Sequence, residues 1–152
     1  MIADCFLDTN ILVYAALPSP MQAAKRKRAA ELIADTRFGI SAQVLQEFYV
    51  TVTRKGTRPL TPREAMEWIE QLELQPCVPI DASLVKIAVE VSERYRISYW
   101  DGAIIAAAEA LGVDTVYSED LNDGQVYGEV RVRNPFKDST CGGFHENRTT
   151  SL

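Results

Sequence analysis

The chain has 152 residues, of which 47% are hydrophobic and 24% charged, and its formal net charge at pH 7 is −5. This size and composition are typical of one soluble globular domain, with or without a tail, that buries a core. Three dispersed cysteines without a C-x-x-C motif argue against a disulfide framework or a zinc site. The N-terminus lacks the basic region of a signal peptide, and no apolar run approaches the roughly 20 residues of a membrane span. We therefore expect a cytoplasmic protein without a membrane segment.

The chain begins with an apolar strand, predicted over residues 2–7, that runs directly into Asp8, Thr9 and Asn10. A carboxylate, a hydroxyl and an amide therefore follow the carboxyl end of a strand, where open α/β sheets bind ligands. The alternative is that Asp8 or Asn10 only caps the next helix. Taken alone, the motif fits a cap and an active site equally well.

Helices and strands then alternate along the chain. Apolar periodicity and capping residues predict helices over residues 11–17, 21–35, 43–55, 61–74 and 99–111, and one more after Asp81. Short strands are expected at residues 38–40, 77–80, 115–117 and 129–132, the second of them at a sheet edge because it contains Pro79. Such alternation indicates a parallel sheet with helices on both faces. We expect residues 1–136 to form one domain and the polar residues 137–152 to be a disordered tail.

The net negative charge argues at first against a nucleic-acid partner, but the charge is unevenly distributed. A basic block lies at residues 25–28, and a looser group of basic residues begins at residue 54. Both would remain free to hold phosphates if the acids gather in one metal-binding pocket. The alternative is a solvated helix face, because four consecutive charges point all round a helix. The candidate RNA-binding residues are Lys25, Arg26, Lys27, Arg28, Arg54 and Lys55.

Two acids lie on or beside apolar helix faces. Glu47 is at the edge of the apolar stripe of its helix, so it is either a surface residue or directed into a pocket beside the core. Apolar residues follow Asp101 at the spacing of one helix face, so this acid shares the buried face of its helix. A carboxylate there is costly unless it is paired or bound to a metal. Ser98 and Asp101 also fit a capping box, and both roles are compatible.

Asp120 and Asp123 follow a predicted strand, as Asp8 does. Loops are commonly rich in Asp, so each alone means little. However, Asp8, Asp120 and Asp101 converge if the first strand and the strand at residues 115–117 are neighbours. Converging carboxylates must take up protons or bind a cation, and oxygen ligands without His or Cys select Mg²⁺ or Mn²⁺. Such ions can assist phosphodiester hydrolysis, whereas the single histidine, His145, lies in the tail and disfavours histidine-based catalysis.

Four segments together resemble the PIN-domain family, in its order and spacing. They are F-L-D-T-N-I-L at residues 6–12, the helix with Glu47, S-Y-W-D-G-A-I-I-A-A-A at residues 98–108, and Y-S-E-D-L at residues 117–121. The closest resemblance is to VapC-type toxins of bacterial toxin–antitoxin pairs, and it covers residues 1–136. It implies a three-layer α/β/α fold with a central parallel sheet of about four or five strands.

The resemblance further implies a Mg²⁺- or Mn²⁺-dependent endoribonuclease, a homodimer, and a cognate antitoxin that occupies the site. As a hypothesis, Asp8, Asp101 and Asp120 hold the metal, and Glu47 binds or orients the attacking water. Family members often read T-x-D-x-D in the last motif, whereas residue 122 is Asn here and the extra acid is Asp123. Asp123 therefore ranks below the other four acids. The implied catalytic residues are Asp8, Glu47, Asp101 and Asp120, and the implied supporting residues are Thr9, Asn10, Ser118 and Asp123.

Two other functions stay open. A metal-dependent phosphotransferase or phosphatase would use an aspartyl nucleophile and needs a lysine beside the phosphate, which the sequence does not identify. A catalytically silent module would bind RNA or a protein partner without turnover, and the presence of all four acids argues against it.

Overall fold

The structure is a computed structural model in which residues 3–137 are described. Except for Lys137, the tail that was predicted to be disordered lies outside these residues. Within the described part of the chain, no helix is long and apolar enough to cross a membrane.

Residues 3–137 contain one six-stranded sheet, in which the strands lie in the order β3-β2-β1-β4-β6-β5. The central strand β1 (Cys5–Leu7) is parallel to β2 (Phe38–Ser41) on one side and to β4 (Thr115–Tyr117) on the other. The strand β3 (Cys77–Val78) forms the expected edge next to β2, and β6 (Val130–Arg133) is parallel to β4. The last strand, β5 (Val126–Tyr127), is antiparallel to β6. The mostly parallel α/β fold is confirmed, with β5 added to the strands that the sequence predicted.

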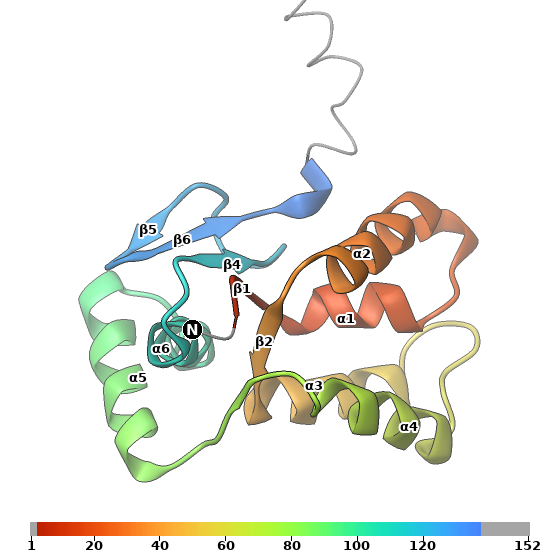
Figure 1. Cartoon of the computed structure of the whole chain (residues 1–152), viewed down its shortest axis with the longest axis horizontal. Helices are drawn as coiled ribbons and strands as arrows, with labels where there is room; N and C mark the ends of the chain where they lie inside the picture. The colour runs from red at the N-terminus through yellow and green to blue at the C-terminus, as the bar shows by residue number, and fades with distance from the viewer. Residues whose placement is uncertain (1–2, 138–152) are drawn as a thin grey trace, which may run out of the picture.

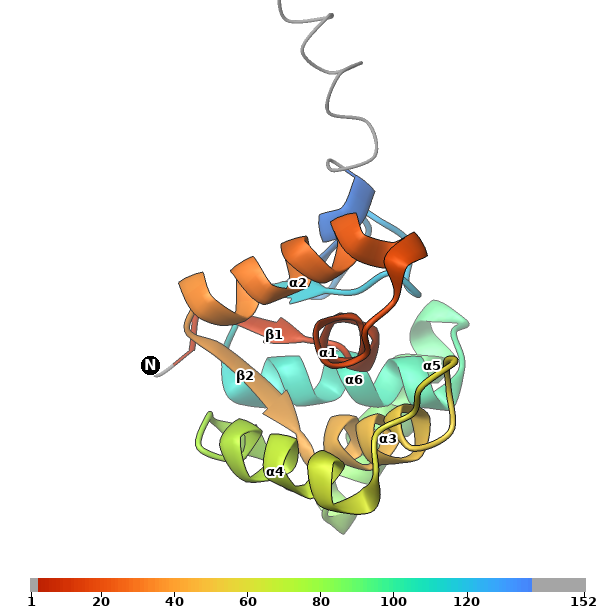
Figure 2. The ribbon, with the colours of Figure 1, turned by 90° about the vertical axis from the view of Figure 1, so that its right-hand side faces the viewer.

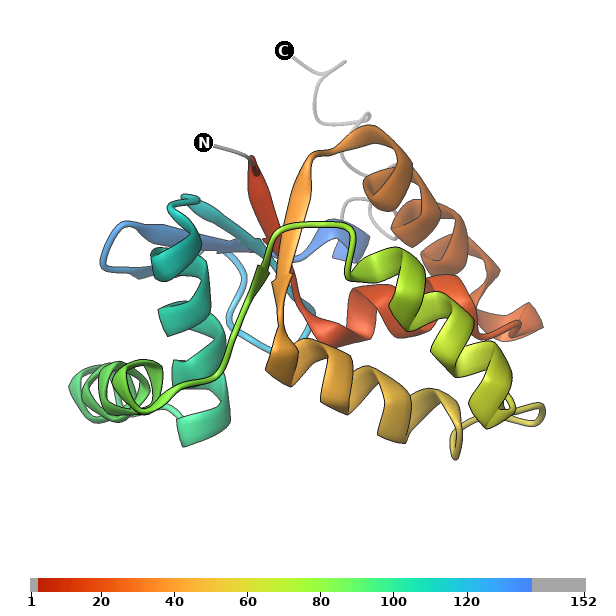
Figure 3. The ribbon, with the colours of Figure 1, turned by 60° about the horizontal axis from the view of Figure 1, so that its bottom comes forward.

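Helices cover both faces of this sheet (Figure 1). On one side lie α1 (Thr9–Ala16) and α2 (Ala23–Asp35), which follows the short 3₁₀ helix η1 (Pro20–Gln22). On the other side α6 (Tyr99–Leu111) contacts the strands and α5 (Ala82–Tyr95) packs against α6. Figure 2 shows α2 and α6 on opposite sides of β1 and β2. The pair α3 (Ala42–Val52) and α4 (Pro62–Leu72) lies beside α1, and Figure 3 shows β1 and β2 between the α5–α6 pair and helices α1–α4.

Helices α3 to α6 begin within one residue of the predicted positions, and in each a polar side chain satisfies one of the first backbone N–H groups. The side chain of Ser41 accepts a hydrogen bond from the amide of Val44 at the start of α3. Thr61 and Glu64 form a capping box at the start of α4, and Asp81 caps α5. At the other end of α6, Gly112 adopts the left-handed conformation with φ of 85°, which ends the helix.

Close packing of α5 on α6 depends on one glycine. A Cβ atom on Gly102 would lie 2.8 Å from the carbonyl oxygen of Ala88 and 3.0 Å from the Cβ of Ser92. Because residue 102 has no side chain, the first turn of α6 can approach α5 closely. This packing fixes the turn that carries Asp101, one of the candidate site acids.

Candidate active site

The carboxyl ends of β1 and β4 lie side by side, as the convergence of the acids requires. Leu7 pairs with Tyr117 in the parallel ladder, and the amide of Asp8 donates to the carbonyl of Tyr117 at 3.0 Å. The turn after β1 therefore lies against the loop that starts at Ser118. Residues that are about 110 positions apart in the sequence meet at this edge of the sheet.

Asp8 lies at the centre of this edge and is only 4% exposed. Its Oδ1 accepts a hydrogen bond from the amide of Thr9 at 2.7 Å, and its Oδ2 accepts one from the hydroxyl of Ser118 at 2.8 Å. Burial, with added repulsion from Asp120 and Glu47, raises the pKa of Asp8 to about 6 although the two hydrogen bonds lower it. Asp8 therefore caps α1, and it is also electrostatically coupled to two of the other acids.

Ser118 organises the loop that carries Asp120. Its side chain is fully buried, and its Oγ, besides donating to Asp8, accepts from the amide of Asp120 at 3.1 Å and from the amide of Leu121 at 3.4 Å. The side chain of Asp120 is exposed. The Ser118 hydroxyl thus fixes the backbone of the exposed Asp120 relative to the buried Asp8.

Glu47 points toward the same edge from α3 and not toward free solvent. Its Oε1 accepts from the hydroxyl of Thr9 at 2.7 Å, and its Oε2 accepts from the side-chain amide of Gln43 at 3.1 Å. Gln43 is buried and also donates to the carbonyl of Trp100 at 3.3 Å, so it links α3 to the start of α6. Sequence reasoning missed Gln43. The available signal was a polar residue next to the apolar stripe of α3, one helical turn before Glu47.

Asp101 lies in the first turn of α6, where its amide donates to the hydroxyl of Ser98 at 3.0 Å. Its side chain is half-buried. Burial raises the pKa of Asp101, and repulsion by Asp120 and by Glu47 raises it further, while a hydrogen bond to Ser98 lowers it. Asp101 therefore belongs to the same electrostatic cluster as the other three acids.

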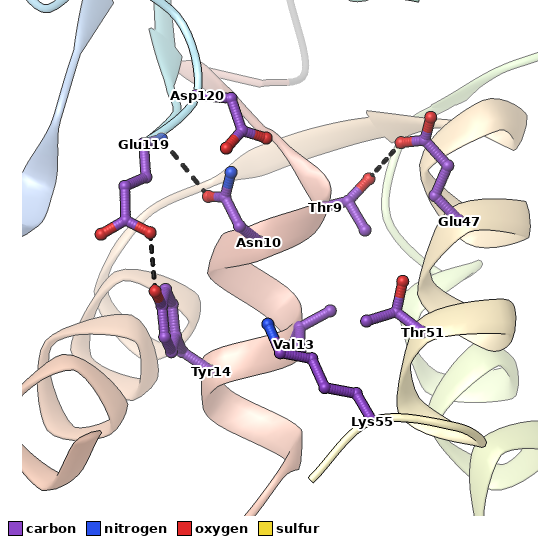
Figure 4. Close-up of a pocket in the computed structure, with 9 residues that line it drawn as sticks. All are labelled: Thr9, Asn10, Val13, Tyr14, Glu47, Thr51, Lys55, Glu119 and Asp120. Carbon is purple, nitrogen blue, oxygen red and sulfur yellow. Dashed lines mark hydrogen bonds between the residues drawn. The ribbon is translucent and has the colours of Figure 1, made fainter. Parts of the chain in front are cut away.

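A cleft of about 380 Å³ opens beside these acids, between α1 and α3 (Figure 4). Glu47 and Asp120 line it, whereas Asp8 and Asp101 do not. Lys55 is the basic residue on its wall. The Nδ2 atom of Asn10 is buried and has no hydrogen-bond partner among the described residues. The cleft is lined by Thr9, Asn10, Val13, Tyr14, Glu47, Thr51, Lys55, Glu119 and Asp120.

The donor set of this edge suits a hard divalent cation, although no cage is formed in advance. Among residues 3–137, no three His, Cys, Asp or Glu side chains are arranged to hold a metal ion. Mg²⁺, however, keeps several waters and needs only one or two direct carboxylates, so a three-carboxylate cage is not required. The pKa values of Asp8 and Asp101 are raised mainly by burial, with added repulsion from Asp120 and Glu47, and no cationic side chain lowers either of them. The residues therefore fit Mg²⁺ or Mn²⁺.

A second polar network supports the cleft from the side of α2. Glu119 forms an ion pair with Lys25 and accepts a hydrogen bond from the hydroxyl of Tyr14 at 2.6 Å. The ammonium of Lys25 also lies 5.0 Å from the centroid of the Tyr14 ring and 5.6 Å from that of Phe136. Burial raises the pKa of Glu119, but the hydrogen bonds from Lys25 and Tyr14 outweigh it and lower the pKa overall. Sequence reasoning missed Glu119, although it directly follows Ser118.

The other predicted residues lie outside the cleft. Asp123 accepts a hydrogen bond from the amide of Asn134 at 2.8 Å and forms an ion pair with Lys137 at 3.5 Å. Arg28 donates to the carbonyl of Pro135 at 3.3 Å. Arg26, Lys27 and Arg54 are exposed and do not line the acid cleft. Arg26 and Lys27 line a separate groove near η1.

Comparison with known proteins agrees with this geometry. The family model of the PIN domain matches residues 5–127. No curated protein sequence matches the chain. Among solved structures, VapC20 of Mycobacterium tuberculosis, described as a sarcin–ricin loop cleaving toxin, is 20% identical with a TM-score of 0.62, over 77% of this chain and 90% of that chain.

Two further solved structures are similar to the same degree. A chain of FitAB bound to an IR36 DNA fragment is 20% identical with a TM-score of 0.63, over 87% of this chain and 95% of that chain. A chain of VapBC2 from Rickettsia felis, bound to a promoter DNA fragment, is 17% identical with a TM-score of 0.58, over 86% and 97%. At these identities the similarity concerns the fold. The family model, which spans most of the residues from β1 to β5, shows that the chain belongs to the PIN domain family.

Proposed function

We propose that the protein is a Mg²⁺- or Mn²⁺-dependent endoribonuclease and the toxin of a VapBC-type toxin–antitoxin pair. The observation that carries the proposal is the convergence of four acids from four elements at one edge of the sheet, where burial and then repulsion by Asp120 and Glu47 raise the pKa of both Asp8 and Asp101. Membership of the PIN domain family and the similarity to VapC20, described as a sarcin–ricin loop cleaving toxin, support it. A toxin–antitoxin complex from Klebsiella pneumoniae, which is 16% identical with a TM-score of 0.63 over 87% of this chain and 98% of that chain, supports a cognate antitoxin as partner.

In the proposed mechanism, Asp8, Asp101 and Asp120 would hold the metal directly or through water. A divalent ion bound there would neutralise negative charge and lower the pKa of water, which hydrolysis of a phosphodiester needs. Glu47, held between the Thr9 hydroxyl and the Gln43 amide, would orient the attacking water.

The substrate phosphate is held from the other wall of the cleft. Lys55 supplies a positive charge there for a phosphate oxygen. The antitoxin would inhibit by occupying this cleft, and a homodimer in the cytoplasm remains part of the proposal.

The decisive experiment incubates the purified protein with structured RNA in Mg²⁺, in Mn²⁺ and in EDTA. We expect cleavage with either metal, none in EDTA, and none for Asp8→Asn with an unchanged circular dichroism spectrum. Asp35→Asn is the matched control, because Asp35 is an exposed acid at the end of α2, at the opposite edge of the sheet. An Asp8→Asn protein that still cleaves RNA contradicts the assignment.

The same material separates the alternatives. Hydrolysis of small phosphomonoesters without RNA cleavage would indicate a phosphatase, and RNA binding without cleavage in any metal would indicate a silent module. Co-expression with the product of an adjacent small reading frame tests the antitoxin, because a true antitoxin co-purifies and suppresses cleavage. Sedimentation of the free protein tests the homodimer.

A further inference from the structure

A second groove adjoins the acid cleft on the far side of Glu47. It has a volume of about 380 Å³ and lies between α3 and the start of α6. Glu47 and Thr51 line both the groove and the acid cleft, so the two hollows are neighbours that share these residues as a wall. The Trp100 groove, as we name it, is lined by Gln43, Gln46, Glu47, Val50, Thr51 and Trp100.

The walls of the Trp100 groove are apolar and open to solvent. The indole of Trp100 is 63% exposed and Val50 is 49% exposed. The backbone at Trp100 is held to α3, because its carbonyl accepts the hydrogen bond from buried Gln43, and the indole lies edge-on to the ring of Tyr99 at a centroid distance of 5.0 Å. A large aromatic side chain that is largely exposed is available to a ligand.

We propose that the Trp100 groove binds the base of an unpaired nucleotide next to the scissile phosphate, with the base stacked on the indole. The inference rests on the proposed function, because it assumes that a phosphate of RNA enters the adjoining acid cleft. An indole stacks on any base, since every base has a π-face, and an unpaired base has that face free. The exposed side-chain amide of Gln46 can both donate to and accept from the edge of a base.

The division of charge between the two hollows favours a base as the occupant. The residues that line the Trp100 groove include no Lys or Arg, so this groove suits a neutral, flat group and not a phosphate. Lys55 lies instead on the wall of the acid cleft, where we place the phosphate. A single nucleotide carries both a flat, neutral base and a charged phosphate. It can therefore place its base in the Trp100 groove and its phosphate in the adjoining acid cleft.

The test measures RNA binding in a background that does not cleave. Asp8→Asn protein is titrated in magnesium with fluorescein-labelled single-stranded RNA of about ten nucleotides, and anisotropy gives Kd. We expect Trp100→Ala to raise Kd by about 5-fold to 100-fold, which is the usual range for loss of one base–aromatic stack, and Trp100→Phe to restore most of the affinity. Met66→Ala is the matched control, because Met66 is exposed and apolar but lies on α4 outside both hollows. RNA that has an abasic site next to the scissile phosphate should bind with the same Kd to the Asp8→Asn protein and to the Asp8→Asn protein that also carries Trp100→Ala.

Each other outcome overturns the inference in a recognisable way. Equal Kd values with and without the indole, or no RNA binding at all, exclude a base-binding role. Loss of affinity that tracks dissociation into monomers in sedimentation shows that Trp100 contacts a second copy of the chain. Release of a bound protein partner with unchanged RNA affinity assigns the groove to that partner. Failure of the proposed function looks different: wild-type protein then cleaves no RNA in Mg²⁺ or Mn²⁺, while the dependence of RNA binding on Trp100 persists.

Discussion

Replacing Asp8 by asparagine should stabilise the metal-free protein at neutral pH while it abolishes function. Burial, with added repulsion from Asp120 and Glu47, raises the pKa of Asp8 from 3.8 to about 6. A carboxyl whose pKa is raised by folding binds its proton more tightly in the folded state, so stability falls as pH rises. The penalty is nearly absent below pH 4, grows between about pH 4 and pH 6, and is complete above about pH 6.

The size of this effect follows from the shift. Roughly two pKa units correspond to a penalty on the order of 3 kcal/mol, and nearly complete burial leaves little screening by solvent. Asparagine keeps an acceptor for the Thr9 amide but weakens the hydrogen bond from Ser118, which costs about 1 kcal/mol. The net gain is then about 2 kcal/mol, or roughly 4–8 °C in Tm for a domain of this size.

Thermal unfolding in EDTA at pH 4 and pH 7.5 measures the effect, with Asp35→Asn as the control. We expect Asp8→Asn to raise Tm at pH 7.5 and to lower it by roughly 2–4 °C at pH 4, where the charge penalty is nearly absent and only the weakened hydrogen bond from Ser118 remains. Added Mn²⁺ should raise the Tm of the wild-type protein at pH 7.5 and have little effect on Asp8→Asn. A loss of stability of equal size at both pH values would refute the reasoning, because it would mean that the hydrogen bonds of Asp8 outweigh its charge.

Three further substitutions test the surroundings of the acids. Gln43→Leu should weaken Mn²⁺ binding about tenfold in calorimetry, because Glu47 loses one of its two hydrogen bonds; unchanged affinity would exclude Gln43 as a positioning residue. Gly102→Ala should lower the free energy of unfolding in urea by about 1–3 kcal/mol, since its Cβ meets the backbone of α5, and unchanged stability would show that α5 shifts freely. Lys25→Met should raise the pKa of Glu119 in a ¹³C titration, because it removes the positive charge that stabilises the carboxylate. An unchanged pKa would mean that Lys25 does not stabilise the charged form of Glu119.

The sequence predicted the elements whose signals are local. The buried strand before Asp8 and the capping residues of α4 and α6 each lie within a few positions of what they determine, and all of them occur as expected. The sequence left open whether β1 and β4 are neighbours, and the structure shows that they pair, which brings Asp8 beside Ser118. The strand β5 was missed because two residues, one exposed and one buried, carry no measurable period.

Side-chain partnerships between distant elements were beyond the sequence. Gln43 and Glu119 are polar residues on elements that have a solvated side, and only the packing of other elements gives them partners. Lys25 belongs to a run of four charges whose members differ only by about 100° in direction around α2. Asp123 could equally have faced the acids or the hairpin, and its hydrogen bond to the amide of Asn134 was not visible in any local pattern.

The arrangement of basic residues predicts a shallow salt dependence of RNA binding. Lys25 is held by Glu119, Arg28 is paired with Glu31 at 3.7 Å, and Arg26 and Lys27 line a groove apart from the acids. Lys55 alone of the predicted basic residues lines the acid cleft, so one or two phosphate contacts are expected. For single strands each contact contributes about −0.7 to the slope of log K against log salt concentration, which gives a slope near −1. A slope steeper than about −3 would mean that the basic block of α2 also contacts the RNA, and that the substrate extends well beyond the cleft and the Trp100 groove.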